Sequence, residues 1–175
     1  MSTFFKLLLI IFFISSKAFA TESDYIFNEK SMNYLYSISE SYFKKSRINL
    51  IKDSMGIILR YIFEDPIDEY FNKNYDVYKK IEHFLAKIEN SAIIEVHLED
   101  LTTVKNLKNM KAWELSTIMA NDIEAIMTIP QGLLKQNRIS SVGYGEFLPR
   151  KNTSNNGGKK SNRLDIIIQC NINGE

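Results

Sequence analysis

A short block of ionisable side chains near the middle of the chain has a spacing that could bind a cation. Glu95, His97 and Glu99 alternate within a run whose alanine and β-branched residues predict a strand over residues 92–98. Because successive side chains of a strand point to opposite faces, these three would share one side, where a carboxylate could hold a positive group. The alternative is structural: His97 would be a hydrogen-bonded partner within the fold, and Glu99 or Asp100 would cap the following loop.

Motifs for other chemistry are missing from the sequence. It has no Gly-x-Ser-x-Gly elbow, no His-Glu-x-x-His and no phosphate-binding loop. Its two histidines, His83 and His97, have no Cys or His neighbours at metal-ligand spacing, and His83 is expected on the surface of a helix. The single cysteine, Cys170, cannot form an intramolecular disulfide. The sequence therefore predicts a protein that is not an enzyme and that needs no cofactor and no metal.

Length and composition predict one exported globular domain. A chain of 175 residues, 45% of them hydrophobic, can bury a single core, and its formal net charge of +1 gives no reason to expect a nucleic-acid partner. Residues 1–20 join a basic head and an apolar run to small residues ending in Ala18-Phe19-Ala20, the pattern of a cleaved signal peptide. The alternative is an uncleaved N-terminal anchor. We expect no transmembrane span in the mature chain.

Hydrophobic periodicity predicts the elements that position these residues. Residues 21–30 are expected to be disordered, and a helix capped by Ser31 should follow to residue 43. Strands over 48–51 and 57–63 should form a hairpin around a turn at 53–56. Asn74 should cap a helix over 75–88, and a longer helix should span 110–127. Strands over 139–144 and 164–170 close the chain.

The same patterns predict the core. On the longer helix the expected buried residues are Trp113, Leu115, Ile118, Met119, Ile123 and Ile126, and on the strands they are Ile94, Val96, Ile166 and Ile168. The order β-α-β-α-β-β predicts an α/β (α+β) sandwich, in which helices pack on a mixed sheet. An N-terminal helix and hairpin would precede these six elements.

Three blocks of the sequence, residues 93–100, 112–146 and 162–168, carry a further pattern. In order and approximate spacing they resemble the peptidoglycan-binding domain shared by OmpA, Pal and the stator protein MotB. The run Trp113-Glu114-Leu115-Ser116-Thr117 is similar to MotB, and residues 143–146 keep the family's Gly-Tyr-Gly-Glu turn. The resemblance covers residues 57–170. It implies an OmpA-like domain over 57–172, preceded by an extension over 21–56.

The resemblance also implies a ligand site formed by His97, Glu99, Ser116, Met119 and Arg163. Family members use a carboxylate after the second strand to meet the ammonium group of diaminopimelate in the peptidoglycan stem peptide, and here Glu99 stands there. A helical arginine of the family clamps a diaminopimelate carboxylate, but this chain has Met119, which carries no charge and no donor. Losing such a contact costs a few kcal/mol, or about two orders of magnitude in affinity.

Only one arginine of the family's Asn-Arg-Arg-Val-Asp block remains, as Arg163. Arg150, Lys151, Lys159 and Lys160 could replace the lost positive charge, or they could simply belong to a solvated loop. Two functions follow from the resemblance. The chain is either a periplasmic module, associated with the wall or outer membrane, that binds peptidoglycan non-covalently, or a non-binding scaffold or docking subunit of an envelope assembly such as a secretion system. We expect weak or absent binding by the natural sequence.

Overall fold

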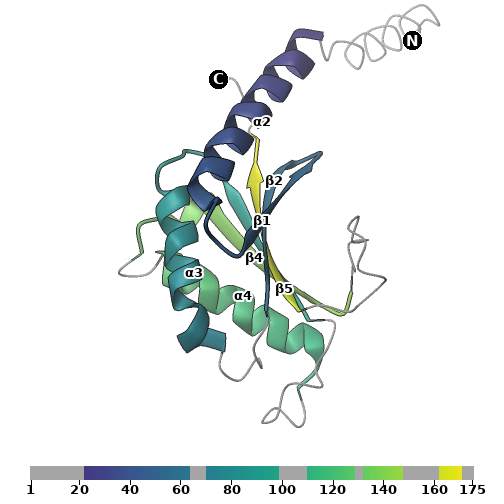
Figure 1. The fold of residues 1–175 in the computed structure, drawn as a ribbon. Coiled ribbons are helices and arrows are strands. Elements are labelled where there is room, and N and C mark those ends of the chain that lie inside the picture. The colour runs from purple at the N-terminus through teal and green to yellow at the C-terminus, as the bar shows by residue number, and fades with distance from the viewer. Residues whose placement is uncertain (1–21, 64–69, 99–109, 129–131, 148–161, 171–175) are drawn as a thin grey trace, which may run out of the picture.

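The computed structural model describes residues 22–63, 70–98, 110–128, 132–147 and 162–170. In chain order the elements are α2 (Glu22–Phe43), β1 (Ile48–Asp53), β2 (Gly56–Ile62), α3 (Tyr70–Leu85), β3 (Ala92–His97), α4 (Ala112–Thr128), the short 3-10 helix η2 (Gln136–Arg138), β4 (Ile139–Gly145) and β5 (Arg163–Gln169). Helices and a mixed sheet pack together, as Figure 1 shows. The predicted α+β sandwich is confirmed.

The last strand of the chain lies in the middle of the sheet. The strand order is β1-β2-β5-β3-β4, with β3 and β4 parallel and every other neighbouring pair antiparallel. Strand β5 therefore has β2 on one side and β3 on the other. This register places Asp165 between Arg60 and Glu95, and Arg163 beside His97. Residues from three distant parts of the sequence thus meet across the centre of the sheet.

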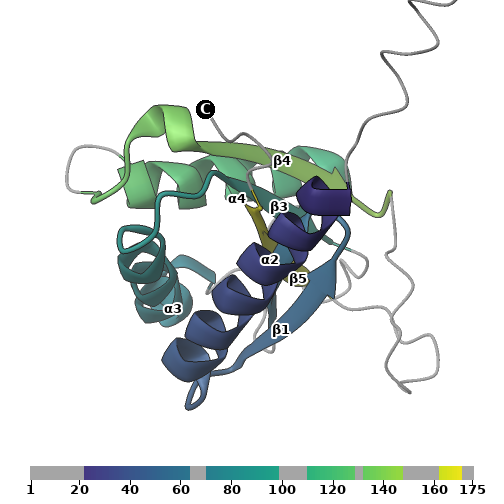
Figure 2. The ribbon, with the colours of Figure 1, turned by 90° about the horizontal axis from the view of Figure 1, so that it is seen from above.

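The three α-helices that the structure describes pack on one face of this sheet (Figure 2). Alternate strand residues supply the sheet's half of that core, and the helices supply the other half. The fully buried members include Ile57, Leu59, Tyr78, Ile81, Ile94, Val96, Met119, Ile123, Leu164, Ile166 and Ile168. Each buried aliphatic side chain contributes about 1.5–3 kcal/mol through removal from water, so this layer is the main source of stability.

The β1–β2 hairpin forms where the sequence predicts it. Gly56 has φ +148, and a Cβ there would stand 1.9 Å from the carbonyl oxygen of Ile168. The turn before it is held by the Asp53 carboxylate, which accepts a hydrogen bond from the backbone N–H of Met55 at 3.2 Å. Only glycine gives the chain both the backbone angle and the close approach at this position.

Two helices begin earlier than the sequence predicts. Helix α2 starts at Glu22 rather than Ser31, because residues 22–30 contain no glycine or proline that would end it. Helix α3 starts at Tyr70, so Asn74 lies within it and is not its cap. Asn74 is buried, and its side-chain oxygen accepts a 2.6 Å hydrogen bond from the Tyr61 hydroxyl of β2.

Helix α4 buries a narrower face than the sequence predicts. Leu115, Met119 and Ile123 are buried as expected, but Trp113 is 46% and Ile118 is 45% exposed. The buried stripe begins at Ala112 and continues in steps of three and four residues, and both exposed side chains fall outside that phase. Ile126 packs against the core and is partly buried.

Candidate functional site

A buried ion pair occupies the sheet face opposite the helices. Side chains of Arg60 and Asp165 alternate with the core residues of β2 and β5, so they point away from the helix layer. The Arg60 guanidinium donates two hydrogen bonds of 2.8 Å to the two carboxylate oxygens of Asp165. Arg163 adds a third contact, from its Nε to Asp165 Oδ2 at 3.3 Å. Asp165 and Arg163 are both 0% exposed.

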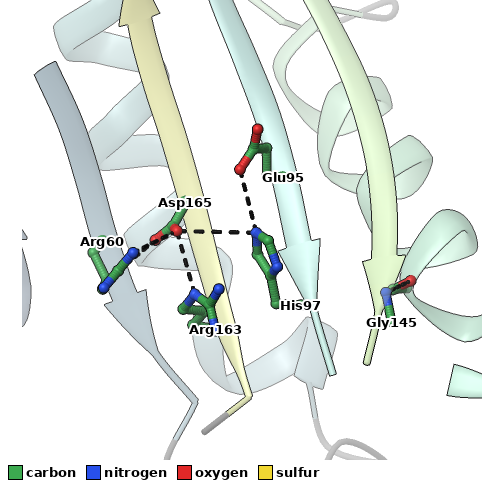
Figure 3. A network of polar contacts seen from close by, with 7 residues as sticks. Arg60, Glu95, His97, Gly145, Arg163 and Asp165 are labelled. Carbon is green, nitrogen blue, oxygen red and sulfur yellow. Dashed lines mark hydrogen bonds and ion pairs between the residues drawn. The ribbon is translucent and has the colours of Figure 1, made fainter. Parts of the chain in front are cut away.

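His97 extends this network to β3. Its Nε2 lies 3.2 Å from Glu95 Oε2 and 4.0 Å from Asp165 Oδ2, so a proton on Nε2 is donated towards a carboxylate (Figure 3). The imidazole also stacks on the ring of Tyr144 in β4, with centroids 5.1 Å apart and an interplanar angle of 18°. His97 is 1% exposed. Its surroundings agree with the structural alternative, in which it is a partner within the fold.

The network contains donors for a metal ion, but its charges disfavour one. Ligand atoms of Glu95, His97 and Asp165 lie within 4.8 Å of one another, close enough to share a cation. Arg60 and Arg163 already face Asp165, and these two guanidinium groups balance the two carboxylates. A divalent ion would add two uncompensated positive charges to a buried site, which is costly. The carboxylates of Glu95 and Asp165 therefore have basic side chains of the same chain as partners and not a metal ion.

Ser116 joins the start of α4 to the end of β4. Its hydroxyl donates to the Trp113 carbonyl at 3.0 Å and accepts a 2.8 Å hydrogen bond from the backbone N–H of Gly145. A Cβ on Gly143 would stand 2.1 Å from the backbone nitrogen of Thr117, so helix and strand backbones are in direct contact. The glycines of the Gly-Tyr-Gly-Glu turn therefore serve this contact, and the Ser116 hydroxyl has both a donor and an acceptor partner beside it.

Met119, at the position of the family's arginine, is 1% exposed and belongs to the core cluster under α4. Ala120 and Ile123 of the same helix belong to the same cluster. Met119 is buried among other apolar side chains, and such surroundings favour an uncharged residue over an arginine. The position at which the family binds a ligand carboxylate is therefore part of the hydrophobic core in this chain.

The structure separates the predicted site residues. Met119 lies on the helix face of the sheet, whereas Arg163 and His97 lie on the opposite face, because Arg163 alternates with the core residue Leu164. Ser116 is on the helix side, at the end of β4. Glu99 and the basic residues within 150–160 lie outside the described residues. The four predicted site residues that can be located therefore form two pairs on opposite faces of the sheet: His97 with Arg163 on β3 and β5, and Ser116 with Met119, one turn apart on α4.

Sequence reasoning missed Arg60, Asp165 and Tyr144. The alternation of Glu95 and His97 correctly predicts that their side chains share a face, but their partners come from β2, β4 and β5. The one available signal was a charged residue inside an apolar strand: Arg60 within residues 57–62, and Asp165 within 164–168. Buried charges need partners, so two such strands with opposite charges favour pairing.

No protein-family model matches this sequence, and no curated protein does. Solved structures do match the fold. A protein described as MotB-like from Desulfovibrio vulgaris superposes with a TM-score of 0.65 at 19% identity, over 83% of this chain and 96% of that one. This chain has the MotB-like fold.

Two further structures share the MotB-like fold. The periplasmic domain of Helicobacter pylori MotB matches with a TM-score of 0.51 at 19% identity, over 70% of this chain and 81% of that one. The cell wall anchor of the T6SS from Pseudomonas aeruginosa matches with a TM-score of 0.52 at 16% identity, over 74% and 95%. The resemblance inferred from the sequence blocks is confirmed for the fold. None of the helices that the structure describes combines the length and the hydrophobicity of a membrane-spanning segment.

Proposed function

We propose that this chain is a non-enzymatic structural module of a bacterial cell envelope, which uses the MotB-like fold as a docking scaffold and has lost the family's clamp for the peptidoglycan stem peptide. It sits in the periplasm as part of a larger assembly, and other proteins of that assembly are its partners. Its own binding to peptidoglycan is weak or absent.

The burial of Met119 is the observation that carries this proposal. The resemblance places a carboxylate-clamping arginine at this helical position, and here a methionine that is 1% exposed packs into the core. Arg163 offers no substitute, because it is 0% exposed, contacts Asp165 and lies on the other side of the sheet. A stem-peptide carboxylate would therefore find no arginine on the helix, where this chain has Met119, and could not reach the buried Arg163.

The second candidate function is direct anchoring to the wall. It is favoured by the fold, since one of the similar structures is described as a cell wall anchor, and by Glu99, which keeps a carboxylate where the family has one. This candidate needs a ligand site built from Glu99 without the helical arginine. Such a site would hold the ammonium group of diaminopimelate through one charge only, so its binding would be weak and sensitive to salt.

Co-sedimentation with purified sacculi distinguishes the two candidates. The mature chain, residues 21–175, is spun with sacculi beside the periplasmic domain of Helicobacter pylori MotB, and Glu99→Gln is compared with Glu89→Gln, a matched change at an exposed residue. We expect sedimentation near background for all three forms of this chain. Sedimentation equal to the reference, lost in Glu99→Gln and kept in Glu89→Gln, would establish wall anchoring instead.

The docking role has its own test in the native host. Envelopes are treated with lysozyme to remove peptidoglycan and then solubilised in mild detergent, and the size of the complex that contains this chain is measured. A docking subunit should stay in a large complex after the wall is digested. A chain that elutes as a monomer once peptidoglycan is gone would be held by the wall alone, which would contradict the proposal.

Export is part of the same proposal and rests on the pattern of residues 1–20. Mass spectrometry of the protein recovered from the periplasm should find Thr21 at the N-terminus. A mass that includes Met1 would show an uncleaved anchor, and fractionation with the cytoplasm would remove the periplasmic assignment.

A further inference from the structure

The methionines of this chain divide into two groups. The described residues contain five of the six methionines in the sequence, and four of these belong to the hydrophobic core or pack against it: Met32, Met110, Met119 and Met127. Met55 lies outside that cluster and is 47% exposed, whereas Met119 and Met127 are 1% and 0% exposed. Of the five, Met55 therefore offers the thioether that solvent reaches most easily.

Met55 lies in the turn of the β1–β2 hairpin, whose tip stands at the periphery of the molecule in Figure 1. Its backbone N–H donates to the Asp53 carboxylate at 3.2 Å, and its carbonyl accepts a 3.2 Å hydrogen bond from the backbone N–H of Cys170. Both hydrogen bonds use the backbone of Met55. A chemical change confined to the side chain therefore leaves the contacts that hold the turn in place.

We propose that Met55 is a reversible oxidation site, at which the folded chain takes up one oxygen atom from a hydroperoxide. The sulfur lone pair attacks a peroxide oxygen, the S–O bond forms as the O–O bond breaks, and the proton of the transferred oxygen leaves with the other oxygen as water. Sulfur loses two electrons and the peroxide gains them. Two thiols of a methionine sulfoxide reductase return these electrons and form a disulfide and water. This site does not depend on the docking role proposed above.

The location of Met55 determines what oxidation does to the chain. A sulfoxide replaces an apolar side chain by a polar one, which disrupts a core. Met119 and Met127 are enclosed by apolar side chains, so their oxidation requires local opening and leaves a polar group in the core. The sulfoxide of Met55 stays hydrated at an exposed turn. Met55 is therefore oxidised without opening, and a reductase reaches it on the folded chain.

The neighbouring thiol is a poorer target below neutral pH. The register of β2 and β5, continued by the hydrogen bond from Cys170, places that cysteine opposite Met55. Cys170 is partly buried, and burial raises the pKa of its thiol, so it carries less thiolate than an exposed cysteine at the same pH. A thioether has no proton to lose and needs no such activation. Acidic buffer therefore slows the reaction of peroxide with Cys170 but not with Met55.

Peptide mass spectrometry of the complete mature chain, treated with hydrogen peroxide at about pH 6, tests the proposal. One oxygen should appear at Met55 at least about tenfold faster than at Met119 or Met127, because buried groups react only through opening. The melting temperature should stay within about 2 °C of the untreated value. Methionine sulfoxide reductase with dithiothreitol should remove the oxygen. In urea, the rate advantage of Met55 should disappear.

Two variants make the test specific. Met55→Leu removes the sulfur with little change in volume, so it should abolish the first oxygen uptake and leave the melting temperature unchanged. Met32→Leu is the matched control, the same substitution at a methionine that packs against the core, and it should keep the uptake at Met55.

Equal oxidation rates for Met55 and the core methionines in the folded chain would overturn the proposal, and so would a first oxygen on Cys170 at this pH. A Met55 sulfoxide that the reductase leaves in place, or that lowers the melting temperature by more than about 5 °C, would indicate oxidative damage and not a reversible site.

Discussion

Asp165→Asn should be among the most damaging single substitutions in this chain. The carboxylate is 0% exposed and receives two 2.8 Å hydrogen bonds from Arg60 and one 3.3 Å contact from Arg163. Replacing it with a neutral amide leaves two buried guanidinium groups without their counter-charge. Breaking a buried pair in this way costs about 3–5 kcal/mol, a large share of the 5–15 kcal/mol that typically stabilises a domain.

Urea unfolding followed by circular dichroism measures this loss. With a slope of about 1–3 kcal/mol per M, the midpoint of Asp165→Asn should fall by at least about 1 M. Arg60→Met should cost less, because Asp165 then keeps Arg163 as a partner. Asp76→Asn makes the same chemical change at an exposed residue and should stay within about 0.5 kcal/mol. An unchanged midpoint for Asp165→Asn, or a larger loss for Arg60→Met, would refute the network.

Further predictions concern α4, β4 and the cysteine. Leu115→Ala should lower the free energy of unfolding by about 2–5 kcal/mol through a cavity, whereas Trp113→Ala at its exposed neighbour should cost less than Leu115→Ala; the reverse order of urea midpoints would show that the α4 phase is wrong. Gly143→Ala should destabilise the chain, because its Cβ would stand 2.1 Å from the Thr117 backbone nitrogen, and a melting temperature equal to that of the natural chain would contradict this contact. Burial raises the pKa of the Cys170 thiol, so less thiolate is present at a given pH when the chain is folded. The midpoint of its alkylation rate against pH should therefore lie higher for the folded than for the urea-unfolded chain, and equal midpoints would argue against burial.

The sequence predicts the fold well where local patterns determine it. The Asp53 to Gly56 turn requires a particular backbone and a glycine, and β-branched runs on either side leave few alternatives to a hairpin. Alternation along residues 92–98 correctly places Glu95 and His97 on one side of β3. The sequence predicts the buried face of a helix less well, as Trp113 shows. A large aromatic residue on a helix favours burial, but the buried stripe of α4 begins one residue earlier, at Ala112.

The candidate site could not be assembled from the sequence. Arg60, His97 and Asp165 are separated by tens of residues, and only the central position of β5 brings them together. Strand order depends on long-range packing, which single-sequence patterns do not contain. The face on which Arg163 lies is set by its alternation with the core residue Leu164, and the resemblance groups Arg163 with Met119 although the sheet separates the two.

Titration of the mature chain with a soluble stem peptide that contains diaminopimelate, followed by NMR, tests whether this chain has lost the stem-peptide site. We expect no saturable change in the amide signals of α4 or of the residues after β3, because Met119 belongs to the core and Arg163 is buried on the opposite face of the sheet. Saturable shifts around Ser116 and Met119, at concentrations where the Helicobacter pylori MotB domain also responds, would contradict it.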